Sequence, residues 1–131
     1  MEPRPPGRDG IGELIGLEYV ETTPERIHAR VPVTEDILQP AGLVHGGVYS
    51  AMAESVCSAA TWLAVQGEGM NAMGQSNSAT FLRPITKGHV NAFARPRHRG
   101  RTTWVWDVEI TDDDERLCAM VRMTVAVRPS R

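Results

Sequence analysis

Two different periods of apolar residues follow each other in the first part of the chain. Between Gly10 and Gly16, apolar residues recur at helical spacing, which predicts one or two turns of helix. Apolar and polar residues then alternate over residues 27–33, after a Thr-Pro-Glu turn at residues 23–25, and this alternation predicts a strand. Pro32 has no N–H to donate to a neighbouring strand, so we expect this strand to lie near an edge or to end there.

The longest helical pattern begins within residues 39–58, QPAGLVHGGVYSAMAESVCS, around which the chain is organised. Five apolar residues at spacings of three and four form one stripe: Val48, Met52, Val56, Ala59 and Leu63. Gly67 and Gly69 are expected to end this helix. Because most of its other residues are small and apolar, we expect the helix to be buried on most sides against a sheet.

The remaining residues predict four strands joined by short turns: 73–83, 88–96, 102–111 and 116–127. No second helix follows any of them, so the sheet is expected to be antiparallel. The predicted class is therefore α+β, with a curved antiparallel sheet of five to six strands wrapped around one long central helix. We expect one domain over residues 11–131, preceded by a flexible arm of residues 1–10 that is rich in proline and glycine.

Composition narrows the functional classes. The 131 residues carry sixteen acidic and fourteen basic side chains, so no broad basic charge indicates a nucleic acid or a membrane as partner. Two cysteines are too few for a disulfide framework, and the first residues lack the apolar middle of a signal peptide, which favours a cytoplasmic location. The histidines and cysteines have no metal-ligand spacing. We therefore expect a small-molecule or protein partner and no metal.

His45-Gly46-Gly47 stands at the predicted first turn of the long helix, where backbone N–H groups have no partner within the helix. Glycine at this place lets a ligand approach the backbone closely. The N–H groups would then stabilise the oxyanion that forms when a carbonyl carbon is attacked. A glycine-rich helix start with a capping histidine explains the same three residues equally well.

Glu54 is the one carboxylate within residues 39–58, and Ser58 follows one turn later on the same face. A carboxylate among small apolar neighbours is expected to be at least partly buried; the alternative is a glutamate on an exposed stripe. Gly46 and Glu54 are eight residues apart, about 12 Å along a helix axis. One helix therefore cannot place both on one carbonyl, and a shared site needs two subunits with antiparallel helices across a two-fold axis.

Five short motifs stand in order along this segment: Gln39-Pro40, Gly42, His45-Gly46-Gly47, Ala53-Glu54-Ser55 and Ser58. In order and spacing they resemble the hot-dog-fold acyl-CoA thioesterases, and among these the branch that acts on 4-hydroxybenzoyl-CoA, 1,4-dihydroxy-2-naphthoyl-CoA and related aryl-CoA thioesters. The resemblance covers nearly the whole chain after the first ten residues. Glu and Gln stand where the phenylacetate-pathway relatives have Asp and Asn, which favours the aryl-CoA branch.

The resemblance implies a role for each of these residues. Glu54 would be the catalytic carboxylate, either as a nucleophile or as the general base that activates water. The Gly46 N–H would hold the oxyanion, and Ser58 would orient Glu54 or its water. Gln39 and His45 would hold the thioester carbonyl and align the loop at the helix start.

The resemblance also implies where the substrate binds. Phe81 falls where some close relatives carry a polar residue facing the acyl group, which favours an apolar acyl chain over a hydroxyaryl group. The family places the nucleotide end of coenzyme A near the turn of residues 97–102, whose cations and hydroxyl suit phosphate oxygens; a solvated basic hairpin tip is the alternative. The candidate residues for substrate and coenzyme A are Gly47, Phe81, Arg83, Arg99, Gly100, Arg101 and Thr102.

We therefore expect an acyl-CoA thioesterase that hydrolyses an aryl- or other acyl-CoA thioester to a free acid and CoA, working as a homodimer or a dimer of dimers. Coenzyme A is then part of the substrate, and no further cofactor is expected. A non-catalytic acyl-CoA binding module on the same fold is the alternative, although it would not need Glu54. A hydratase of this fold is disfavoured, because the Asp followed five residues later by His that such an enzyme would carry is missing.

Overall fold

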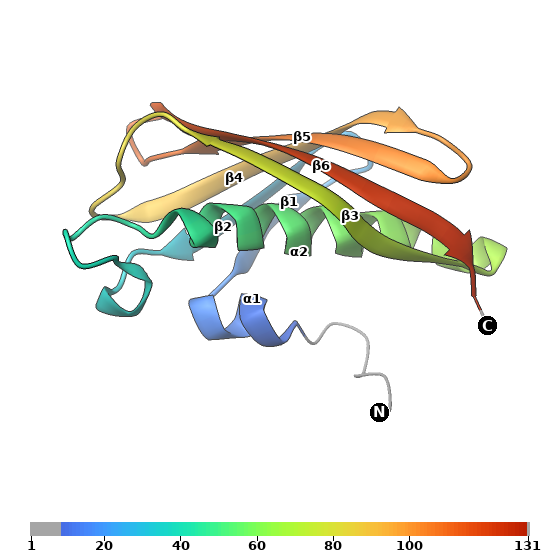
Figure 1. Cartoon of the computed structure of the whole chain (residues 1–131), viewed down its shortest axis with the longest axis horizontal. Helices are drawn as coiled ribbons and strands as arrows, with labels where there is room; N and C mark the ends of the chain where they lie inside the picture. Colours follow the sequence, from blue (N-terminus) through green and yellow to red (C-terminus); the bar gives the residue numbers. More distant parts are fainter. Residues whose placement is uncertain (1–8, 131) are drawn as a thin grey trace.

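The computed structural model describes residues 9–130, and Figure 1 shows a curved sheet lying over one long helix. Most of the predicted N-terminal arm, residues 1–8, lies outside the described residues, as does Arg131. The helices and strands within residues 9–130 are, in chain order, α1 (Gly10–Ile15), β1 (Glu18–Thr22), β2 (Ile27–Pro32), the 3-10 helix η1 (Glu35–Ile37), α2 (Gly46–Val65), the 3-10 helix η2 (Gln66–Glu68), β3 (Met70–Phe81), β4 (His89–Arg99), β5 (Thr103–Thr111) and β6 (Leu117–Pro129).

The strands form one six-stranded sheet in the order β1-β2-β4-β5-β6-β3, and every neighbouring pair is antiparallel. The sheet curves over α2, which runs along its concave face (Figure 1). Antiparallel neighbours can be joined by short turns, which is why β4, β5 and β6 follow one another without a helix. The predicted α+β class, an antiparallel sheet around one long helix, is confirmed.

The predicted strand at residues 27–33 is β2, which ends at Pro32. Because β2 lies between β1 and β4, Pro32 marks the end of a strand and not an edge of the sheet. The two edge strands are β1 and β3. The four later strands begin and end within three residues of their predicted boundaries.

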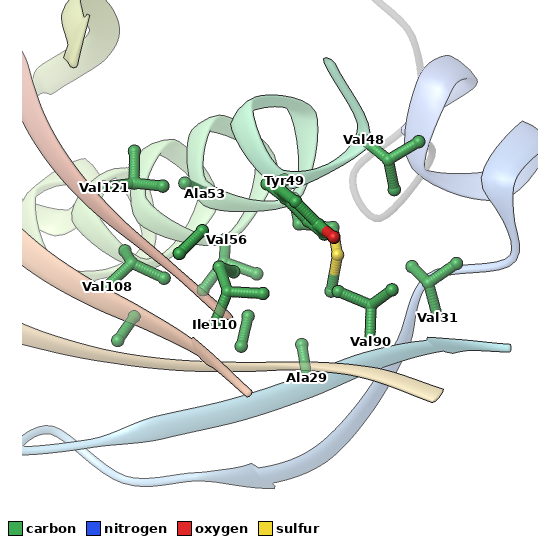
Figure 2. Packing of buried hydrophobic residues seen from close by; sticks show 14 of the residues in the cluster. Ala29, Val31, Val48, Tyr49, Ala53, Val56, Val90, Val108, Ile110 and Val121 are labelled. Carbon is green, nitrogen blue, oxygen red and sulfur yellow. The ribbon is translucent and has the colours of Figure 1, made fainter. Parts of the chain in front are cut away.

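The core fills the space between α2 and the concave face of the sheet. Trp106, Val108 and Ile110 of β5 are buried at every second position, as the two-residue period of a strand requires. Figure 2 shows side chains of the helix facing those of the sheet: Val48, Tyr49, Ala53 and Val56 on one side, and Ala29, Val31, Val90, Val108, Ile110 and Val121 on the other. Burying a large apolar side chain contributes about 1.5–3 kcal/mol, so this layer is the main source of stability.

The predicted apolar stripe of the long helix is only partly right. Val48, Met52 and Val56 are buried, but Ala59 and Leu63 are exposed, and 59% of the Leu63 surface is accessible. Buried side chains instead continue in four-residue steps: Tyr49, Ala53, Cys57, Thr61 and Val65. Each step of four residues turns about 40° further around a helix, so the buried face rotates along α2. The twist of the covering sheet explains this rotation.

Thr61 ties the second half of α2 to the sheet. Its hydroxyl donates to the Cys57 carbonyl at 2.7 Å and accepts from the Trp106 indole N–H at 2.9 Å, and all three residues are buried. We expect Thr61→Val, which keeps the shape of the side chain, to lower the free energy of unfolding by about 1–3 kcal/mol, because the buried indole N–H loses its acceptor. Urea denaturation followed by tryptophan fluorescence measures this change. Thr86→Val, at an exposed position, is the matched control.

Candidate active site

His45 caps the first turn of α2. Its backbone is extended, and its Nδ1 accepts a hydrogen bond from the Gly47 N–H at 2.9 Å. Two backbone hydrogen bonds hold the residue in place, one from the Val44 N–H to the Ile85 carbonyl and one from the His45 N–H to the Ile37 carbonyl. The capping role considered for His45 is therefore right. It leaves the opposite ring nitrogen, Nε2, for a ligand.

Gly46 begins α2 with an N–H that has no acceptor among the described residues. The ring of Phe81, at the end of β3, occupies the space of a side chain at position 46, since a Cβ there would lie 2.5 Å from the Phe81 Cζ. The Tyr49 ring lies next to the Phe81 ring, with 5.8 Å between the two ring centroids. A side chain at position 46 would therefore displace the Phe81 ring, which lies beside the Gly46 N–H.

Gln39 lies in the loop that leads to His45 and Gly46 at the start of α2. Its backbone N–H donates to the Leu43 carbonyl at 2.8 Å, which closes the loop. Its side-chain oxygen accepts from the Ala41 N–H, so the NH2 group is the half of the amide that has no partner among the described residues. Three donors thus stand in the loop and the first helical turn at this end of α2: this NH2 group, the histidine Nε2–H and the glycine N–H.

Glu54 is exposed in the single chain, so the prediction that it is partly buried is wrong here. It lines an open pocket of about 670 Å³ between α1, α2 and β3, together with Ser58 and Asn77. The Ser58 Oγ is buried and has no hydrogen-bond partner among the described residues. Strand β3 passes close to the carboxylate at Gly74, where a Cβ would lie 3.4 Å from the Glu54 carboxyl carbon.

The two halves of the candidate site do not meet within one chain. Gly46 and Glu54 are eight residues apart on one continuous helix, which corresponds to about 12 Å along the axis and about 80° around it. A carbonyl group bound at the Gly46 N–H is therefore out of reach of the carboxylate of the same chain. If both groups act on one substrate, a second copy of the chain must supply one of them.

The other candidate nucleophiles and bases either have a raised pKa, which keeps them protonated, or already cap a helix. Burial raises the pKa of the Cys57 thiol and of the Cys118 thiol, so neither forms a thiolate at neutral pH. Burial also raises the pKa of Tyr49 to about 12. Asp9, the other carboxylate that lines the pocket, caps α1. This leaves Glu54 as the carboxylate available for chemistry in the pocket.

The basic turn between β4 and β5 lies at the opposite end of α2 from Gly46 (Figure 1). Arg99 is partly engaged, because it donates to the Pro24 carbonyl at 2.5 Å and lies 5.6 Å from the centroid of the Trp104 ring. Arg101 is exposed and has no ion pair among the described residues. A substrate whose phosphate binds at this turn would therefore have its acyl group far from Gly46, at the start of α2 in the same chain.

The remaining candidate residues for coenzyme A do not form one cluster. The Gly100 N–H donates to the Thr103 carbonyl at 2.9 Å, which closes the turn, and Thr102 is exposed beside it. Arg83 is exposed in the loop after β3. That loop and the β4–β5 turn lie at opposite ends of α2 (Figure 1), so the structure does not bring Arg83 to the turn.

Asn77, which was not predicted as a site residue, lies on β3, and its Nδ2 donates to the Ser50 carbonyl of α2 at 2.9 Å. The register of β3 against β6 shifts between Gly74 and Ser76. This irregularity adds a residue to the strand, so the face towards the helix passes from Gly74 to Asn77. A strict two-residue period would have placed Asn77 on the opposite face, and a glycine before a polar run was the only signal of a bulge.

A larger cavity, of about 1210 Å³, lies on the outer face of the sheet, away from Glu54. Two of the carboxylates that line it are paired: Asp107 bonds to Arg122, also in the lining, at 2.9 Å, and Asp113 to His89, outside it, at 3.2 Å. Within residues 9–130 no three histidine, cysteine or carboxylate side chains are grouped so that they could hold a metal ion. The smaller pocket with Glu54 is therefore the candidate active site.

Over the same residues, no helix has both the length and the apolar character that crossing a bilayer requires. The longest helix, α2, carries Glu54 at its centre.

Comparison with known proteins identifies the family. Residues 41–119 match the family model described as the thioesterase superfamily. The proofreading thioesterase EntH of Klebsiella pneumoniae is 35% identical over 113 residues, which is 86% of this chain and 82% of that protein.

Two solved structures resemble the whole fold. A mutant of the thioesterase PA1618 of Pseudomonas aeruginosa has a TM-score of 0.87 and 38% identity, over 91% of this chain and 86% of that one. The thioesterase HI1161 of Haemophilus influenzae has a TM-score of 0.85 and 34% identity, over 91% of this chain and 82% of that one. The aryl-CoA branch stays a prediction, since none of these names specifies it. The chain belongs to the thioesterase superfamily and has the hot-dog fold.

Proposed function

We propose that this chain is an acyl-CoA thioesterase, which hydrolyses an acyl-CoA thioester to a free acid and coenzyme A. The observation that carries the proposal is an unpartnered N–H at the start of α2 together with a carboxylate in an open pocket of the same helix. A free N–H suits a developing oxyanion, and a carboxylate suits attack on a carbonyl carbon or activation of water. A module that only binds acyl-CoA would need neither.

Hydrolysis would pass through a tetrahedral intermediate at the thioester carbon. Glu54 either attacks this carbon, which gives an anhydride that water then hydrolyses, or removes a proton from an attacking water. The carbonyl electron pair moves onto oxygen, where the Gly46 N–H stabilises it, and collapse breaks the C–S bond and releases the thiolate. The Gln39 NH2 and the His45 Nε2 would hold the carbonyl in place. Ser58 would orient the carboxylate or its water.

We propose that the two halves of the site come from two copies of the chain. β3 is an edge strand, so one side of its backbone has no partner strand among residues 9–130. Over Met70–Phe81 it carries no charged residue and no proline, which commonly keep edge strands from pairing. Antiparallel pairing of two such strands would bring the Gly46 N–H of one copy towards Glu54 of the other across a two-fold axis. A homodimer is the smallest such assembly, and a dimer of dimers would contain it twice.

Phe81 and Tyr49 support an apolar or aryl acyl group. Their rings form the wall beside the Gly46 N–H, and 57% of the Phe81 surface is accessible in the single chain. An acyl group whose carbonyl is bound at this N–H would lie against that ring. Aromatic side chains bind apolar and aromatic groups through their faces and edges. The backbone of Gly47, without a side chain, leaves room beside the same carbonyl.

We propose that the nucleotide end of coenzyme A binds at the β4–β5 turn of the second copy. Arg101→Gln is then expected to raise KM for acyl-CoA about fivefold, because a solvent-exposed contact of a guanidinium with phosphate contributes about 1 kcal/mol. The value of kcat should stay the same. Steady-state kinetics measure both, and Arg122→Gln, on the outer face of the sheet, is the control. An equal rise in KM for an acyl-pantetheine, which has no nucleotide, would contradict phosphate binding at the turn.

The proposed function is tested by incubating the purified protein with a panel of aryl- and fatty acyl-CoA thioesters and following thiol release. We expect release from at least one apolar or aryl thioester. Binding of acyl-CoA in calorimetry without thiol release from any member of the panel would favour the binding module instead.

A further inference from the structure

Asn77 reaches from β3 to the helical turn that carries Glu54. Its Nδ2 donates to the Ser50 carbonyl at 2.9 Å, and in an α-helix this carbonyl also accepts the N–H of residue 54. The bond fixes which half of the Asn77 amide faces the helix, because the Ser50 carbonyl only accepts hydrogen bonds and only the NH2 half of the amide donates them. The other half of the amide, Oδ1, is buried and accepts no hydrogen bond among the described residues.

Ser58 is in the same state, since its Oγ is buried and unpartnered as well. Asn77 and Ser58 both line the pocket that holds Glu54. Buried oxygen atoms without a partner are uncommon in folded proteins and often mark a bound water or a functional group. Neither oxygen is accessible to solvent as the side chains stand, so a water reaches them only when the side chains turn towards the pocket that they line.

The hydrogen-bonding character of these groups selects the water. An ionised carboxylate and an amide oxygen accept hydrogen bonds and cannot donate, whereas a serine hydroxyl does both. Glu54 and Asn77 line one pocket, and a molecule that bridges these two acceptors needs two donors; water is the smallest one. A water that gives one hydrogen to Glu54 and the other to Asn77 keeps its lone pairs for the serine hydroxyl and for a carbonyl carbon.

We propose that Asn77 is a positioning residue that, with Ser58, holds the hydrolytic water beside Glu54; this inference rests on the proposed thioesterase function. Glu54 takes one proton of the water, whose oxygen forms the bond to the thioester carbon, while the second hydrogen stays bonded to the Asn77 Oδ1. The carbonyl electron pair moves onto oxygen. Collapse breaks the C–S bond, and the thiolate takes the proton back from Glu54, which therefore acts as a general base.

The test uses Asn77→Ala in the full chain, with Ser78→Ala, its neighbour on the opposite face of β3, as the matched control. We expect kcat of Asn77→Ala to fall about tenfold to a hundredfold and KM to stay within about threefold, because the water is misplaced while substrate binding is kept. Ser78→Ala should keep both native values. If Asn77→Ala does not fold, Asn77→Leu, which is close to asparagine in shape, replaces it.

A second readout separates positioning of water from a general structural defect. Hydroxylamine attacks a thioester without a base to activate it, so it does not depend on the positioned water. Added hydroxylamine should therefore give a higher ratio of hydroxamate to free acid with Asn77→Ala than with the native enzyme. A structural defect would lower both products equally and leave the ratio unchanged.

Three outcomes would overturn the inference. Native kcat in Asn77→Ala, or an unchanged product ratio, would end the positioning role while leaving the thioesterase function intact. A single turnover in ¹⁸O-labelled water whose first product lacks the label would identify Glu54, and not water, as the attacking group. Absence of thiol release from the native protein on every thioester would overturn the proposed function together with this inference.

Discussion

Replacing Glu54 with glutamine is expected to lower the rate of thiol release by about a thousandfold, since general-base catalysis contributes about 10²–10⁴ to a rate. The amide keeps the shape of the carboxylate but neither takes a proton from water nor attacks a carbonyl carbon. Because the thioester carbonyl is proposed to bind at another residue, KM should change little. Steady-state thiol release with the best substrate of the panel measures the effect.

Glu68→Gln is the control for this substitution, because Glu68 is an exposed glutamate of η2 outside the pocket. It should keep the native rate. Native activity in Glu54→Gln would show that the carboxylate takes no part in the reaction, and the mechanism would have to be abandoned.

Mixing two inactive variants is expected to restore activity if the site is shared. Gly46→Pro removes the oxyanion N–H, and Glu54→Gln removes the base, so each homodimer should be inactive. A mixed dimer keeps one site in which the Gly46 N–H and the Glu54 carboxylate are both native. At random equimolar exchange about half of the dimers are mixed, which predicts about a quarter of the native activity per chain.

The proline variant needs its own control, because any Cβ at position 46 meets the ring of Phe81. Gly46→Ala introduces the same Cβ but keeps the N–H. The difference in rate between Gly46→Ala and Gly46→Pro therefore reports the N–H alone. If mass spectrometry shows that subunits have exchanged and activity still does not return, both groups cannot belong to one shared site.

The fold could be predicted wherever a period of side chains decides the structure. The strands were found because one face of each is buried, so apolar residues recur at every second position, as in Trp106, Val108 and Ile110. The buried face of α2 could not be predicted in full, since it depends on the twist of a sheet whose strands lie elsewhere in the sequence. Ala59 and Leu63 continue the helical period but leave the covered face.

The candidate site was predictable where its residues are neighbours in the chain. Gln39, His45 and Gly46 lie within one short loop and the first turn of a helix, so their place at the start of α2 follows from local structure. Asn77 joins the pocket because of an irregularity in β3, which the alternation of residues does not reveal. Burial of Glu54 was expected from its small neighbours, yet its own chain leaves it exposed, because the pocket that it lines between α1, α2 and β3 is open.

The contact between Phe81 and Gly46 separates two properties that evolution usually has to change together: the position of the Gly46 amide and the space for an acyl group. A side chain at position 46 would have to displace the Phe81 ring, so this contact disfavours substitution at the amide. Position 81 can become smaller without moving that amide, and each smaller residue would enlarge the space for an acyl group. Under the proposed function, preference for one acid over another can therefore change by single substitutions at position 81 while the Gly46 N–H stays in place.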